Sequence, residues 1–212
     1  MFSSMRFSII NERTKNALTN TMKRSSFLKS GLAMTSLFYL PDTLYTWFKN
    51  KTRKKEGFKV AAGKDRFDKI LSIFDGDKFF CKVSGKDTDG DMYIFESTRD
   101  REGGPILHVH YEQDEWWYIL EGNFLVRIGD KTYEARPGDF VFGPRGVPHT
   151  FSKVGQGQSR VMIGFQPAGK MEEYFAKISK GVAKDMTEAQ RDEMRKAHGF
   201  ERVGPPIGQL KQ

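Results

Sequence analysis

The sequence predicts an all-β domain followed by short helices, and three observations support this fold class. From residue 58 to residue 167, short runs rich in β-branched and aromatic residues are separated by Gly, Asp and Pro about every 8–12 residues. Two tight-turn signals, Gly129-Asp130 and Pro137-Gly138-Asp139, separate neighbouring runs. No helical periodicity interrupts these runs. Many short antiparallel strands of this kind predict a sandwich or barrel of the jelly-roll type.

Each run is expected to form one strand. The expected strands are Lys78–Lys82, Asp91–Ser97, Ile106–His110, Glu115–Leu120, Asn123–Ile128, Lys131–Ala135, Asp139–Phe142, His149–Ser152 and Arg160–Gln166.

The pattern changes after Pro167. Apolar residues fall at helical spacing between Met171 and Ile178, and a second helix is expected to begin at Thr187, which forms a capping-box pattern with Gln190. An extended tail follows from residue 198. We therefore divide the chain into a basic extension (1–56), a barrel (57–168), and C-terminal helices with a tail (169–212).

The positive charge is confined to the N-terminal extension. Residues 1–56 hold eleven Lys and Arg against three Asp and Glu, so the remaining residues carry 24 basic and 24 acidic side chains and are neutral. Nucleic-acid binding requires a basic face on the folded domain, and a neutral domain argues against it. The single cysteine, Cys81, excludes an intrachain disulfide and a cysteine metal cluster.

Residues 22–48 contain a signal-like segment. Lys23 and Arg24 precede an apolar run at 32–40, which is the order found in export signals. The run is too short for a transmembrane anchor, which needs about 20 apolar residues. The string from Lys23 to Lys29 resembles the twin-arginine signal, with Ser25 in place of the second arginine. We expect export to the periplasm with Met1 or Met22 as the start; the alternative is a cytoplasmic protein in which this segment is an amphipathic helix or arm.

Three of the four histidines lie in two short segments. His108 and His110 are two residues apart on an expected strand, so both imidazoles point to one face. Glu115 follows after a gap long enough for the chain to turn back, and His149 begins a later strand. Such a pair of histidines alone is often structural. Together, three imidazoles and one carboxylate form a ligand set for one divalent ion of Fe, Mn, Ni, Co, Cu or Zn.

Two other carboxylates compete with Glu115 for the role of ligand. Glu112 and Asp114 lie in the same segment. On an extended chain Asp114 would face away from Glu115, so we prefer Glu115.

At these residues the sequence resembles the cupin superfamily. The first cupin motif, G-x(5)-H-x-H-x(3,4)-E-x(6)-G, is matched except that only three residues separate Gly104 from His108. The second motif, G-x(5)-P-x-G-x(2)-H-x(3)-N, is matched except that Lys153 replaces the final Asn. The resemblance implies a jelly-roll barrel of six to eight strands that holds a metal ion. The matching positions are His108, His110, Glu115, Gly122, Gly138, Pro144, Gly146 and His149.

The layout, with a helical tail that ends in Gly204-Pro205-Pro206, is similar to single-domain quercetin 2,3-dioxygenase-like cupins. This resemblance implies an enzyme, a metal-dependent oxidoreductase that cleaves a flavonol or another enol or phenol with O2. Glu115 would be both ligand and catalytic base. A metal-dependent isomerase or decarboxylase and a non-catalytic small-ligand-binding cupin remain alternatives, because fold and ligand set do not fix the reaction.

Alternation along the strands predicts which residues line the pocket, and the resemblance predicts that two subunits pair. Ile106 shares the face of His108, Trp117 and Ile119 share that of Glu115, and Phe151 shares that of His149. These four are the candidate substrate-binding residues, and packing in the barrel core is the more common role for such side chains. Cupin barrels commonly pair, and exposed strand edges give pairing a physical motive, so a homodimer is expected.

Overall fold

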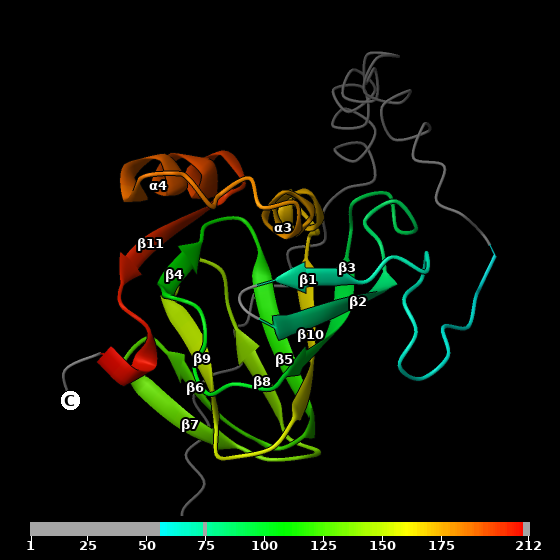
Figure 1. Cartoon of the computed structure of the whole chain (residues 1–212), viewed down its shortest axis with the longest axis horizontal. Coiled ribbons are helices and arrows are strands. Elements are labelled where there is room, and N and C mark those ends of the chain that lie inside the picture. Colours follow the sequence, from blue (N-terminus) through cyan, green and yellow to red (C-terminus); the bar gives the residue numbers. More distant parts are fainter. Residues whose placement is uncertain (1–55, 74–75, 210–212) are drawn as a thin grey trace, which may run out of the picture. The chain divides into compact units, whose positions relative to one another are not determined.

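The computed structural model describes residues 56–73 and 76–209. The signal-like segment at 22–48 and nearly all of the extension at 1–56 lie outside the described residues. Two antiparallel sheets form the framework of the described chain (Figure 1). This confirms the predicted all-β jelly-roll class with short C-terminal helices.

The larger sheet has six strands in the order β1-β2-β3-β10-β5-β8, and the smaller has five in the order β11-β4-β9-β6-β7. The strands of the larger sheet are β1 (Leu71–Ile73), β2 (Asp77–Val83), β3 (Tyr93–Arg99), β10 (Ser159–Gln166), β5 (Asp114–Glu121) and β8 (Phe140–Gly143). Those of the smaller are β11 (Phe200–Gly204), β4 (Leu107–His110), β9 (His149–Val154), β6 (Asn123–Ile128) and β7 (Lys131–Ala135).

Alternation of buried and exposed side chains shows which face of each strand forms the core. Along β5, the buried residues are Glu115, Trp117 and Ile119, and along β6 they are Phe124 and Val126. The inward faces of the two sheets meet in one apolar cluster that also takes in residues of the C-terminal helices. The site described below lies on these same inward faces.

The predicted turns are confirmed. Gly129 and Asp130 form the two-residue connection between β6 and β7, where Ile128 pairs with Lys131. Before β8, the amide of Asp139 donates to the carbonyl of Arg136, and Gly138 has a φ of +96°. A glycine with positive φ after a proline is the arrangement that a type II turn requires.

The C-terminal region differs from expectation in one element. Helices α3 (Met171–Ser179) and α4 (Glu188–Ala197) form where predicted, and the Thr187–Gln190 capping box is present. The expected tail is partly a strand, β11, which pairs with β4 and is followed by the short helix η2 (Ile207–Gln209). Strand β1 was also not predicted. With these two strands, residues 56–73 and 76–209 form eleven strands, more than the six to eight that the resemblance implied.

Helix α3 packs beside β1, and α4 packs against β11. Both helices are visible above the sheets in Figure 1. No helix in residues 56–73 and 76–209 is long and apolar enough to cross a membrane.

At Gly104, shortly before β4, the backbone lies very close to the backbone of β9. A Cβ atom at this position would overlap the backbone carbonyl of Phe151 on β9. Replacing Gly104 with Ala should therefore lower the free energy of unfolding by about 1–3 kcal/mol, the usual cost of overpacking. Gly57→Ala, where a Cβ meets nothing within 4 Å, is the control. Urea or thermal unfolding gives the comparison, and equal stability of the two variants would contradict the argument.

Candidate metal centre

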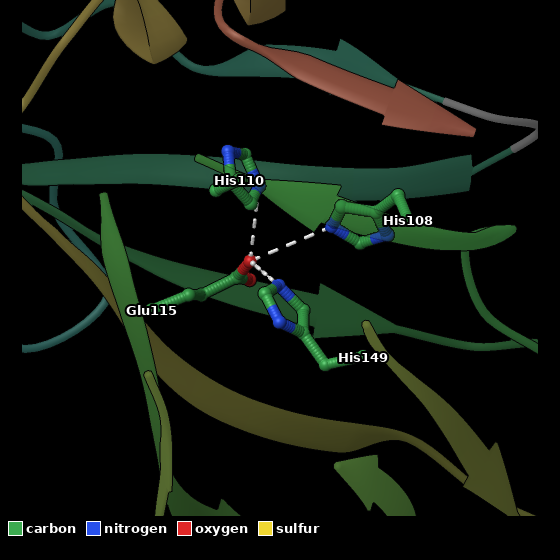
Figure 2. A group of neighbouring side chains, drawn as sticks. All are labelled: His108, His110, Glu115 and His149. Atoms are coloured by element: carbon green, nitrogen blue, oxygen red, sulfur yellow. Dashed lines mark hydrogen bonds and ion pairs between the residues drawn. The ribbon is translucent and has the colours of Figure 1, made fainter. Parts of the chain in front are cut away.

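Neighbouring strands of one sheet supply three imidazoles, and the facing sheet supplies a carboxylate. His108 and His110 alternate on β4 and point to the same side, while His149 is the first residue of β9 and pairs directly with His108. Glu115 comes from β5 in the six-stranded sheet. Figure 2 shows all four side chains converging on one point between the sheets. The structure thus brings together the four residues predicted as ligands.

One carboxylate oxygen lies at the centre of the group. Glu115 Oε2 is 3.1 Å from His149 Nε2, 3.4 Å from His110 Nε2 and 3.6 Å from His108 Nε2. All four residues are buried, and their ligand atoms lie within 4.8 Å of one another. The group therefore has no bulk water to satisfy its polar atoms.

Backbone carbonyls fix the ring orientation of two histidines. His108 Nδ1 donates to the carbonyl of Ile106 at 2.8 Å, and His149 Nδ1 donates to the carbonyl of Val147 at 2.9 Å. With the proton on Nδ1, the Nε2 lone pair of each ring points at the centre of the group. Such a partner behind a ligand is the usual support of metal-binding histidines.

His110 is held differently. Within the described chain, neither of its ring nitrogens has a hydrogen-bond partner. The ring lies between aromatic neighbours instead, with centroid distances of 5.1 Å to Phe200 and 5.5 Å to His149. A fully buried imidazole with both nitrogens unpaired indicates that a group absent from the protein chain completes its contacts.

The geometry fits a divalent transition metal. Lone pairs aimed at a carboxylate repel it unless a cation or a proton lies between them. Ligands that bind one ion at about 2.1 Å and at angles between 90° and tetrahedral lie about 3.0–3.4 Å apart. The three separations of 3.1, 3.4 and 3.6 Å are close to this range. Nitrogen and carboxylate donors suit the ions from Mn to Zn and do not select among them.

The charges of two ligands also suit a cation. Burial alone would raise the pKa of Glu115, but the three imidazoles that surround its carboxylate hold that pKa well below its ordinary value. Burial lowers the pKa of His108 to about 4, against the opposing effect of Glu115. Near neutral pH the site therefore offers an ionised carboxylate and a neutral His108, the forms in which these groups bind metal. The role of Glu115 as a base, which requires a raised pKa, stays a prediction.

The rival carboxylates lie away from the centre. Asp114 accepts two hydrogen bonds from the guanidinium of Arg145, at 3.0 Å from Nε and 2.7 Å from Nη2. Glu112 is exposed. On β5, Asp114 and Glu115 thus face opposite sides of the sheet, as alternation requires.

A cavity of about 300 Å³ adjoins the metal-binding group, because His108 and Glu115 form part of its wall. Most of the other lining side chains are apolar or aromatic. Of the four predicted substrate-binding residues, Ile106 and Phe151 line the cavity, while Trp117 and Ile119 are buried in the core outside the described lining. The ring of Trp117 packs edge-on against His149, at a centroid distance of 5.5 Å.

The sequence did not indicate several lining residues. Arg99 comes from β3, and Arg195 comes from α4. The signal for Arg99 was available, because it continues the inward series of alternate residues Tyr93, Phe95 and Ser97 on its strand. Helix α3 and the chain after it also close the cavity. Their lining residues are Met171, Tyr174, Phe175, Phe200 and Pro206.

One family model matches the central part of the barrel. Residues 95–164 match the family described as the cupin domain. This part of the chain is similar to cupin domains. The matched stretch runs from β3 to β10 and contains the four residues of the metal-binding group.

Individual relatives are more distant. An uncharacterized protein of Methanocaldococcus jannaschii is 31% identical over 62 residues, which are 29% of this chain and 50% of the relative, so the chain matches only half of that protein's length. KdgF from Halomonas sp. is 20% identical with a TM-score of 0.45, covering 53% of this chain and 94% of KdgF. The polyketide cyclase RemF from Streptomyces resistomycificus is 24% identical with a TM-score of 0.43, covering 52% of this chain and 80% of RemF.

Removing one ligand should release the metal. We expect the purified protein to hold one divalent transition-metal ion per chain and His149→Ala to bind that ion at least about tenfold more weakly, since loss of a residue behind a ligand alone costs 10–100-fold. Asp114→Asn removes a neighbouring carboxylate that faces away, and it should keep the ion. Elemental analysis and competition with a chelator measure both. Full metal affinity in His149→Ala would refute the ligand assignment.

Proposed function

We propose that this cupin is a metal-dependent enzyme acting on a small enol or phenol, a dioxygenase of the quercetinase type. The observation that carries the proposal is the position of the metal-binding group in the wall of an apolar cavity. His108 and Glu115 face that cavity, so a bound molecule can reach the ion directly. A site with purely structural metal would be closed on all sides.

The chain's own residues suit an aromatic substrate. The cavity is lined by Phe95, Phe151 and Phe165, whose faces can pack against a flat ring and keep water out. When bound, the divalent ion would supply a Lewis-acidic centre that binds an enolate or phenolate oxygen beside O2. His108, His110, Glu115 and His149 would hold the ion. In the proposed reaction the activated substrate reacts with O2, and its ring is cleaved.

Glu115 has two possible duties in this proposal. As an ionised ligand it contributes negative charge to the centre. As a base it would accept the proton of the substrate hydroxyl, which requires that its carboxylate be within hydrogen-bonding reach of that group. The lowered pKa of Glu115 favours the first duty, whereas only its place in the cavity wall supports the second.

Oxygen uptake tests the reaction class. Metal-loaded protein should consume O2 when mixed with members of a panel of flavonols, simpler enols and phenols, and His149→Ala should show no uptake above background because its ion is lost. Asp114→Asn, which leaves the ligands in place, should retain the wild-type rate. An oxygen electrode measures the rates, with product masses as the second readout. Metal-loaded protein without uptake on any member of the panel would instead favour an isomerase, a decarboxylase or a binding protein.

Two further proposals concern parts of the molecule outside the cavity. We propose that the segment at 22–48 directs export, and that the barrel forms a homodimer. Support for the second is that β8 is an edge strand whose Phe140 and Phe142 are exposed. Exposed edges are a common place for pairing with another chain.

A further inference from the structure

Arg99 occupies an inward position among aromatic side chains. It is 7% exposed, lies at the end of β3 and forms part of the cavity wall. Its guanidinium carbon is 4.9 Å from the centre of the Phe151 ring. Burying a guanidinium in such a place is costly, and an apolar side chain of similar size is often at least as good for stability. Stability alone therefore does not explain a buried arginine at this position.

The guanidinium of Arg99 has an N–H donor without a hydrogen-bond partner in the described chain. Arg99 Nη2 donates to Asp77 Oδ2 at 2.6 Å. Its Nε–H is buried and has no hydrogen-bond partner within the described part of the chain. A guanidinium presents five N–H donors in a planar fork, so a single contact with one carboxylate leaves room for a second acceptor. Because the Arg99 side chain also lines the cavity, its remaining N–H donors point to an acceptor that a ligand brings.

The second arginine of the cavity has its charge compensated by the protein. Arg195 Nη1 lies 2.7 Å from Glu188 Oε1 and 2.5 Å from Asp192 Oδ1. Two carboxylates therefore face this guanidinium, against one for Arg99. This difference makes Arg99 the better candidate for a ligand's acidic group.

We propose that Arg99 binds a carboxylate of the ligand, so that the cavity takes a small enol or phenol that also bears a carboxylic acid. Guanidinium and carboxylate form strong charge-assisted hydrogen bonds. The hydroxyl of the same molecule would face the metal-binding group, which belongs to the same lining, and its ring would lie against Phe95 and Phe151. A volume of about 300 Å³ is at the lower end for ligand pockets and suits a one-ring acid.

Charge supports the same substrate class. The Arg99–Asp77 pair is neutral as a whole, whereas a divalent ion held by the carboxylate of Glu115 and by imidazoles, which bind metal in the neutral form, would carry one net positive charge. A singly charged acid would balance this charge. This inference rests on the proposed function for the role of the hydroxyl, but the acid-binding role of Arg99 can be measured without any reaction.

The test compares two ligands that differ only in charge. Binding of 3-hydroxybenzoate and of its neutral amide, 3-hydroxybenzamide, is measured by calorimetry on the metal-loaded, full-length protein. The meta arrangement prevents the carboxylate and the hydroxyl from chelating the same ion. We expect the acid to bind at least about tenfold more tightly than the amide.

Variants then assign the preference to Arg99. Replacing Arg99 alone would leave Asp77 buried without its partner and endanger folding. The double variant Asp77→Asn/Arg99→Gln avoids this problem and keeps the net charge of the cavity unchanged. It should retain the metal and bind acid and amide equally. Asp77→Asn alone frees the guanidinium and should keep or increase the preference. Arg160→Gln, on the neighbouring β10 and outside the described lining, is the control and should behave as wild type.

Each outcome decides between the two proposals. Equal binding of acid and amide by the wild type, or an undiminished preference in the double variant, would overturn the role of Arg99. Loss of the preference in Arg195→Gln but not in the double variant would assign the carboxylate to the other arginine and overturn it as well. A preference that depends on Arg99 in a protein without oxygen uptake on acidic or neutral phenols would support this inference and reject only the dioxygenase reaction.

Discussion

A carboxylate buried among three imidazoles is the constraint on which the rest of the structure depends. Glu115 is 3% exposed and has no water to stabilise its charge, and the three Nε2 atoms around it would repel it if they offered only lone pairs. Charge of this kind is tolerated in an interior only when it is paired. A divalent ion would satisfy the carboxylate and the imidazoles at once, and the four buried residues fit such an ion.

The two-sheet architecture positions these groups accurately. The histidines come from β4 and β9, and the carboxylate comes from β5 of the facing sheet, so the group is complete only when the sheets pack. The aromatic cluster between the sheets holds this spacing, because Trp117 on β5 contacts Phe151 on β9 at a centroid distance of 6.0 Å. Strand β11 adds a contact from the C-terminal region, because Phe200 lies against the ring of His110. The helical tail is thus part of the site as well as an appendage of the barrel.

How much the sequence could predict follows from the range of each interaction. Strands β6 and β7 were predicted to the residue, because a two-residue turn and local alternation define them. The convergence of the metal-binding residues could also be anticipated, since their spacing and the cupin motifs are local patterns. Strand β11 was read as an extended tail because its strand character depends on pairing with β4, about ninety residues earlier. Arg99 was overlooked because a charged residue in an inward series has no meaning until the cavity beside it is known.

The four candidate ligands and the lining of the cavity therefore determine different properties of the site. Three imidazoles and a carboxylate define which ions can bind, and many reactions use that arrangement. The lining of the cavity is more specific for the substrate, because each unpaired polar group in it needs a hydrogen-bond partner on the bound molecule. In this cavity the positive charge of Arg195 faces two carboxylates of α4, whereas that of Arg99 faces a single carboxylate, Asp77. A neutral flavonol would offer only weak acceptors to the guanidinium of Arg99, whereas the carboxylate of an acid would form charge-assisted hydrogen bonds with it. Physical chemistry of the wall thus argues for a smaller and more acidic substrate than the resemblance to quercetinases implies.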